Sequence, residues 1–177
     1  SSSSSVASSA SVSVENTAPT ITTASISPSS GAVIGTTLTC SSTATDADDG
    51  SLTPTYAWTK SGSSLGTGST YTVSFGDSVG TFITCTATAT DSAGASATSF
   101  ASVSVENTAP TVITAAAISP TSGVVIGTTA ICSTSIYDAD DSSLSPSYVW
   151  SISGTTVSTF FLYTVTASDS DVGDSLV

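Results

Sequence analysis

The chain has 177 residues and a formal net charge of −12, because it combines 13 acidic residues with one basic residue, Lys60, and no histidine. Without histidine, it can form neither a Ser–His nor a Cys–His catalytic pair, and it offers no imidazole metal ligand. Nucleic acids and anionic lipids would be repelled, since both are bound through clustered Lys and Arg. No apolar run approaches the length of about 18 residues that spans a bilayer. We therefore expect no enzyme, no nucleic-acid partner and no membrane insertion in this segment.

An internal repeat organises the chain from its first residues onward. The sequence SVSVENTAP at 11–19 recurs at 102–110, a shift of 91. ISPSSGAVIGTT at 26–37 recurs as ISPTSGVVIGTT at 118–129, a shift of 92, which places one inserted residue near 115–117. The shift of 92 then holds for the pairs Cys40 and Cys132, Asp46 and Asp138, Trp58 and Trp150, and Tyr71 and Tyr163. A period near 90 residues is the size of one small β-sandwich domain.

Alternation of apolar residues with Thr predicts strands in the complete repeat. The most regular one covers 81–90, where Ile83, Cys85, Ala87 and Ala89 face inward. Gly-rich and Asp-rich turns separate the strands. The strands are predicted around 37–45, 56–58, 71–73, 81–90 and 101–105. The fold class predicted from these patterns is all-β.

The cysteines and a tryptophan of this repeat carry a family resemblance. Cys40, Trp58 and Cys85 follow one another as the strand B Cys, strand C Trp and strand F Cys do in immunoglobulin domains, and DSVGTFITC at 77–85 resembles the approach to the second Cys. The repeat is similar to bacterial tandem immunoglobulin-like and PKD-like surface repeats, although Ile83 stands where the immunoglobulin pattern has Tyr. The resemblance implies a Cys40–Cys85 disulfide with Trp58 packed beside it, and an oxidising, extracellular or cell-surface location.

The repeat divides the chain into three parts. Residues 1–17 match the last strand of a repeat, 18–110 form a complete immunoglobulin-like domain, and 111–177 form a second one that lacks its last strands. DSLV at 174–177 matches TFIT at 81–84, so the second copy stops just before its second Cys. Cys132 is therefore predicted to be unpaired or intermolecular.

Two explanations of the incomplete second domain remain open. In the first, the N-terminal strand of a neighbouring subunit, with Val12 and Val14, completes the domain by strand donation. In the second, the 177 residues are an excerpt from a longer tandem array. Both make the chain its own partner, in a linear homopolymer or a longer array.

Acidic residues gather in two DADD loops and in the two ENTAP linkers. Alternating carboxylates suit a hard cation such as calcium, and in cadherin-like repeats the acids of linker and loop hold calcium together. The alternative is a solvated turn, because Asp favours turns for its own backbone hydrogen bonds. The candidate calcium ligands are Glu15, Asp46, Asp48, Asp49, Glu106, Asp138, Asp140 and Asp141.

Hydroxyl groups dominate the predicted outer faces. The row Thr84, Thr86, Thr88 and Thr90 is a candidate for O-linked glycosylation, although Thr also suits an exposed strand for its own sake. We expect a structural protein, an extracellular fibre or surface stalk of linearly joined domains. The alternative is an adhesin or carbohydrate-binding module of the same fold. Its candidate aromatic residues are Tyr56, Phe75, Phe100, Tyr137, Phe160 and Phe161.

Overall fold

The computed structural model describes residues 3–169 and 175–177. It is an all-β protein made of two compact units, Ser1–Glu106 (unit 1) and Asn107–Val177 (unit 2). The boundary lies between residues 106 and 107, whereas the sequence places it between 110 and 111. Among the described residues, no helix has the length and apolar character needed to span a bilayer.

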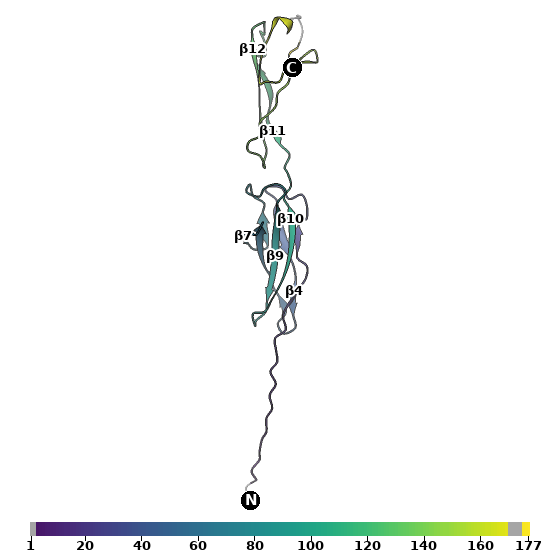
Figure 1. Cartoon of the computed structure of the whole chain (residues 1–177), viewed down its shortest axis with the longest axis vertical. Coiled ribbons are helices and arrows are strands. Elements are labelled where there is room, and N and C mark those ends of the chain that lie inside the picture. The colour runs from purple at the N-terminus through teal and green to yellow at the C-terminus, as the bar shows by residue number, and fades with distance from the viewer. Residues whose placement is uncertain (1–2, 170–174) are drawn as a thin grey trace. The chain divides into compact units, whose positions relative to one another are not determined.

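Unit 1 is a β-sandwich of antiparallel sheets (Figure 1). One layer is the sheet β10-β9-β6-β7, in which β9 and β10 pair along their whole length. The opposite layer contains the sheets β2-β3-β8 and β1-β4-β5. The bounds are β1 Thr20–Ile21, β2 Ser25–Ser27, β3 Thr37–Ser41, β4 Ala44–Asp46, β5 Gly50–Leu52, β6 Thr55–Lys60, β7 Ser63–Thr67, β8 Thr70–Thr72, β9 Phe82–Thr90 and β10 Ser96–Ser104.

The strand predicted at 37–45 is divided between β3 and β4, which lie in different sheets. The break falls at Ser42, whose backbone N–H donates to the Tyr56 hydroxyl at 3.1 Å and whose carbonyl accepts from it at 3.3 Å. Because a side chain takes both backbone groups, Ser42 cannot continue the strand ladder. Leu38, Cys40 and Ala44 are all buried, so the inward face continues across the break.

A disulfide between Cys40 on β3 and Cys85 on β9 joins the two layers. Trp58 on β6 lies opposite Cys85 in the register and is 1% exposed. Its indole Nε1–H donates to the Gly68 carbonyl at 2.9 Å, which satisfies the polar atom of an otherwise apolar ring. The predicted bridge and the core position of Trp58 are both confirmed.

Unit 2 repeats the first strands of unit 1 at the predicted offsets. The sheet β11-β12-β15 corresponds to β2-β3-β8 with β1 and β4 merged into it, and β13-β14 corresponds to β6-β7. The register of β11 shifts between Thr114 and Ala117, where the sequence predicts the inserted residue. The bounds are β11 Thr111–Ser119, β12 Thr129–Tyr137, β13 Trp150–Ile152, β14 Thr155–Ser158, β15 Leu162–Thr164 and the 3-10 helix η1 Ala167–Asp169.

The end of unit 2 begins the strand that corresponds to β9. Leu176 bridges Ile152, as Ile83 pairs with Lys60 in unit 1. Ser151 and Val177 exchange both backbone hydrogen bonds, at 2.9 and 3.0 Å. Within the described part of unit 2, these last residues are all that occupies the place of β9, and no segment occupies the place of β10.

Candidate functional site

The acidic loop of unit 1 is a turn that binds the N-terminal linker. Asp46 is 7% exposed, and its Oδ1 accepts the backbone N–H groups of Asp48 at 2.7 Å and Asp49 at 3.0 Å. Such bonds from an Asp to the following backbone stabilise a turn. Asp48 in turn accepts the backbone N–H of Thr17 at 2.7 Å. The loop therefore fixes the direction in which the linker enters the sandwich.

Unit 2 binds its own linker in the same way. Asp138 Oδ1 accepts the N–H groups of Asp140 at 2.7 Å and Asp141 at 2.9 Å. Asp140 accepts the backbone N–H of Thr108, the residue that matches Thr17. In each unit, the ENTAP linker is thus hydrogen-bonded to the DADD loop, and we call this pair of segments the linker device.

A carboxylate outside the two acidic clusters completes the device in unit 1. Asp91 follows β9, is 6% exposed, and accepts the Asn16 side-chain amide at 2.9 Å. The hydrogen bond from Asn16, with backbone bonds from the loop, outweighs burial and lowers the pKa of Asp91. The available signal was the DSAG turn, because Asp91 also accepts the backbone N–H of Ala95, the residue that follows this turn.

The candidate calcium ligands do not converge. Among the described residues, no three acidic or cysteine side chains form a group that could hold a metal ion. Glu15 is exposed, and the Glu106 carboxylate accepts the backbone N–H of Gly31 at 2.8 Å. One oxygen each of Asp46 and Asp140 is nevertheless buried without a hydrogen-bond partner. Calcium binding stays a hypothesis, and these two buried oxygens are the atoms that would bind the ion.

The most deeply buried of the described carboxylates, Asp77, fixes the loop before β9. It is 1% exposed and accepts the Tyr71 hydroxyl at 2.6 Å, the Ser74 N–H at 2.9 Å and the Lys60 ammonium at 2.9 Å. Burial would raise the pKa of Asp77, but these hydrogen bonds together lower it. Unit 2 has the matching Tyr163–Asp169 pair, with Ile152 in place of the lysine.

The predicted Thr row lies on β9, with β10 on one side and β6 on the other. Thr84, Thr86 and Thr88 are half-buried and Thr90 is exposed. Thr84 exchanges a hydrogen bond with Ser102 at 2.8 Å, and Thr90 does so with Ser96 at 2.8 Å. The hydroxyls of Thr84 and Thr90 therefore bond across the sheet to the edge strand β10.

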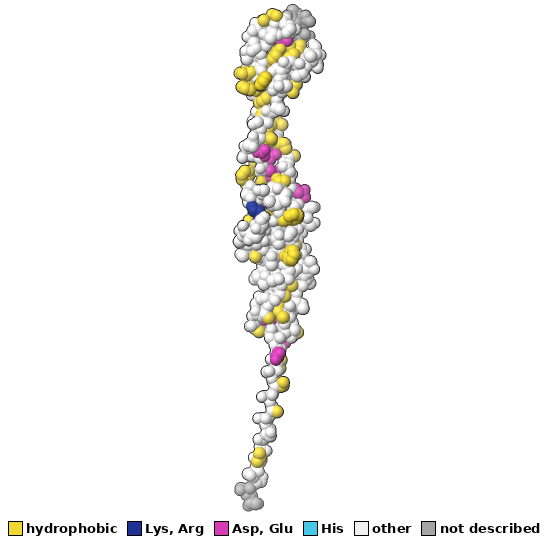
Figure 2. Space-filling model, in the orientation of Figure 1, with side chains coloured by type: hydrophobic (Ala, Val, Ile, Leu, Met, Phe, Trp, Pro, Cys, Tyr) yellow, Lys and Arg dark blue, Asp and Glu magenta, His cyan; other side chains and the backbone are white. Residues whose placement is uncertain are grey.

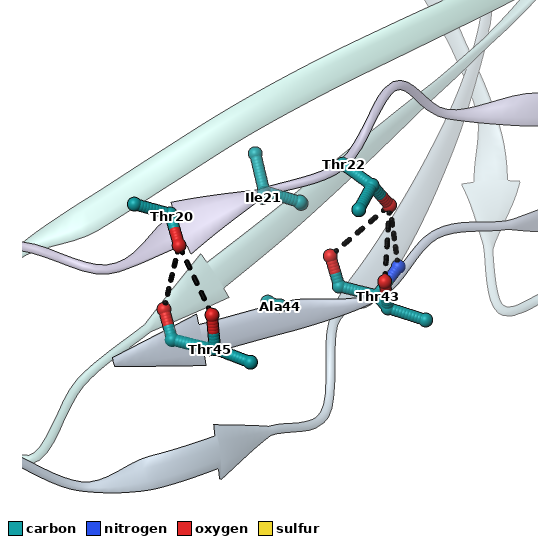
Figure 3. A pocket seen from close by; sticks show the side chains of 6 residues that line it. All are labelled: Thr20, Ile21, Thr22, Thr43, Ala44 and Thr45. Atoms are coloured by element: carbon teal, nitrogen blue, oxygen red, sulfur yellow. Dashed lines mark hydrogen bonds between the residues drawn. The ribbon is translucent and has the colours of Figure 1, made fainter. Parts of the chain in front are cut away.

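A shallow pocket of about 250 Å³ lies between β1 and β4 (Figure 3). Thr20 donates to the Thr45 carbonyl at 3.1 Å, and Thr22 binds Thr43 through its carbonyl, hydroxyl and N–H. Because the lining hydroxyls are already paired, the pocket has the character of a hydrogen-bonded strand edge. The lining residues are Thr20, Ile21, Thr22, Thr43, Ala44 and Thr45.

The N-terminal segment is exposed along its whole described length before Pro19 (Figure 1). Val12 and Val14 are each 92% exposed, so neither of these apolar, β-branched side chains is removed from water. Segment 3–15 belongs to no strand. The predicted donor residues are thus accessible, and they have no partner within the described chain.

Unit 2 buries its core positions less completely than unit 1 does, and it exposes more large apolar side chains. Figure 2 shows hydrophobic side chains gathered on its surface, while most of the remaining surface is neither acidic nor basic. Cys132 is free and half-buried, whereas the matching Cys40 is 2% exposed. The exposed large apolar residues of unit 2 are Val112, Ile113, Val124, Val125, Ile126, Ile131, Tyr137, Leu144, Val149, Phe160, Phe161, Leu162 and Val177.

The candidate sugar-binding aromatics are mostly accessible. Phe75, Phe100 and Tyr137 are exposed, and so is the adjacent pair Phe160 and Phe161, at 74% and 53%. Tyr56 is half-buried and its hydroxyl is used by Ser42. Neither the family models nor the curated proteins compared with the chain give a match.

Proposed function

We propose that the chain is a structural component of an extracellular fibre or cell-surface stalk, built from β-sandwich units joined in a line. The observation that carries this proposal is the duplicated linker device. Thr17 binds Asp48 in unit 1 and Thr108 binds Asp140 in unit 2, so each unit receives the preceding segment through the same contact. Because the same linker sequence precedes and follows unit 1, units of this kind are suited to being joined in series.

The covalent chemistry of unit 1 supports an extracellular setting. The Cys40–Cys85 disulfide is the kind of bond that persists in oxidising compartments. The surface is rich in hydroxyls and poor in positive charge, with Lys60 as the single basic residue of the sequence. We propose that exposed Ser and Thr carry O-linked glycans, which would keep such a surface hydrated. No catalytic group is required by this role.

Electron microscopy and intact mass of native material from the extracellular fraction test this function together. Filaments a few nanometres wide, containing this chain, are the expected result, with mass increments of sugar size after reduction. A dispersed monomer in the native material would refute the structural role. Unmodified mass would refute the glycan part alone.

A carbohydrate-binding or adhesive role is the second candidate, and it is favoured by the exposed pair Phe160 and Phe161. Exposed aromatic faces stack on apolar faces of sugar rings. However, the Phe160 carbonyl accepts the Trp150 indole N–H at 2.8 Å and the Phe161 carbonyl accepts the Cys132 N–H, so the backbone of this pair is part of unit 2 itself. Glycan-array binding that is lost in Phe160→Ser but kept in Phe100→Ser would favour this role.

A further inference from the structure

The N-terminal segment carries the same sequence as the end of β10 and the two residues that follow it. Residues 11–15 and 102–106 both read SVSVE. In unit 1, Val103 and Val105 are 3% and 1% exposed, whereas the matching Val12 and Val14 are each 92% exposed. One sequence is therefore a buried strand in one place and a free strand in the other, and the buried copy shows how the free one would bind.

Unit 1 shows which contacts hold the end of this strand. Val105 bridges Ala32, and the Glu106 N–H donates to the Ala32 carbonyl at 2.8 Å. The Glu106 carboxylate accepts the Gly31 N–H at 2.8 Å. This last bond is charge-assisted, and it can form only when the carboxylate follows the strand in the correct register.

The described part of unit 2 presents the same receptor loop with no strand bound beside it. Gly123 has a φ of 70°, against 71° for the matching Gly31, so the loop that offers its N–H has the same backbone shape. Val124, which matches the fully buried Ala32, is 40% exposed. Leu176 and Val177, bound to Ile152 and Ser151, occupy the start of the β9 position.

We propose that residues Ser11–Glu15 of one copy bind unit 2 of a second copy in the position that β10 occupies in unit 1. This inference rests on the proposed fibre function and specifies how one copy joins the next. The register follows from β10: Ser11 lies opposite Val177, Val12 opposite Leu176, and the Glu15 carboxylate accepts the Gly123 N–H.

The geometry of unit 1 favours donation between two copies, because unit 1 holds the N-terminal segment and the start of unit 2 at opposite ends of its sandwich. Asn16 and Thr17 are bound to Asp91 and Asp48, at the end of the sandwich where β10 begins. Unit 2 leaves from the other end of β10, after Glu106. β10 has nine residues, which extend over about 30 Å. Glu15 directly precedes the anchored Asn16, so it lies at the end of unit 1 opposite to Glu106, after which the chain continues into unit 2. The contact is therefore head-to-tail and extends without closing.

Cysteine cross-linking between two variants tests the register. In unit 1, the Thr84 and Ser102 hydroxyls meet at 2.8 Å, and Val177 and Ser11 match them. A Ser11→Cys chain mixed with a Val177→Cys chain, both carrying Cys132→Ser, should form a disulfide-linked dimer. The matched control is Val12→Cys with Val177→Cys. Neighbouring residues face opposite sides of a strand, so this pair should cross-link at least about tenfold more slowly.

A second variant tests the carboxylate contact. Glu15→Ala in the Ser11→Cys chain should slow cross-linking about tenfold, the loss expected for one charge-assisted hydrogen bond. Ser13→Ala, on the outer face, should leave the rate unchanged. A synthetic peptide of residues 3–16 should compete with the donor chain in the same assay.

The outcomes separate this inference from the proposed function. Equal rates for the Ser11 and Val12 pairs, no cross-linking, or no effect of Glu15→Ala would overturn the proposed binding mode. If native filaments are present and their reduced mass is many times that of this chain, the units are joined covalently and only the donation fails. If native filaments are absent, the fibre function itself fails.

Discussion

Removal of the Cys40–Cys85 bridge gives the most direct quantitative test of the fold. The two cysteines are separated by 45 residues in the sequence. Closing a loop of that length stabilises the native state by about 4 kcal/mol in the chain-entropy model. Both positions are buried, so the double variant Cys40→Ala/Cys85→Ala avoids placing polar groups in the core. We expect its free energy of unfolding to fall by about 4 to 5 kcal/mol, including a small cavity term.

The assay is denaturant unfolding of unit 1 followed by tryptophan fluorescence. Each unit has one tryptophan, Trp58 and Trp150, and both are 1% exposed. In a Trp150→Phe background, Trp58 reports on unit 1 alone, and it lies opposite Cys85 in the register. Cys132→Ala is the matched control, because it removes a free cysteine from unit 2 and should leave the unit 1 transition where it was.

A loss below about 1 kcal/mol in the double variant would refute the reasoning. Such a result would mean that the unfolded chain is already restricted without the bridge, so that loop closure contributes little. An equal loss in the Cys132→Ala control would also refute it, because the effect would then come from general disturbance of the chain.

Three further results are expected. Asp77→Asn should destabilise unit 1 by about 3 kcal/mol, because it leaves Lys60 without its carboxylate partner. Folding lowers the pKa of Asp77 below its ordinary 3.8, so the stabilisation by this carboxylate is present above pH 3.8 and is lost as the pH falls through the pKa of the folded state. Measuring the unfolding midpoint as a function of pH checks this prediction. If calcium binds the acidic turns, EDTA should lower the melting temperature, and an unchanged value contradicts the calcium hypothesis. Trypsin should leave the folded chain intact, because Lys60 lies in β6 between two paired strands; rapid cleavage seen by mass spectrometry would contradict that pairing.

Local patterns were sufficient to predict the strands that span the core. The alternation in β9 identified Ile83, Cys85, Ala87 and Ala89, and each is 0% exposed. The division of the 37–45 strand was missed, because it depends on the Tyr56 hydroxyl, which comes from a different strand. Period-2 alternation continues on both sides of such a break, so no local pattern reveals it.

The candidate site was predicted unevenly for the same reason. The DADD loops were recognised as acidic turns, and the structure shows them binding the linker backbone. Asp77 and Asp91 were missed because each occurs singly in the sequence, and their importance comes from partners brought by folding: Tyr71 and Lys60 for one, Asn16 for the other. A cluster of acidic residues can be recognised in a sequence, whereas the role of a single buried carboxylate is recognised only when the fold shows its hydrogen-bond donors.

The core differences between the two units bear on how unit 2 is completed. Leu38 and Ala32 are both fully buried in unit 1 and belong to one core cluster. In unit 2, Ala130 stands in place of Leu38 and Val124 stands in place of Ala32. The larger side chain of the pair therefore lies on the buried strand in unit 1 and in the loop before it in unit 2. Ala130 alone would leave the core of unit 2 short of volume, which costs stability. A strand bound as β10 would lie beside Val124, as Val105 lies beside Ala32 in unit 1, and would cover this larger side chain. The exchange therefore makes sense for a unit whose core is finished by an added strand, whichever chain segment supplies it.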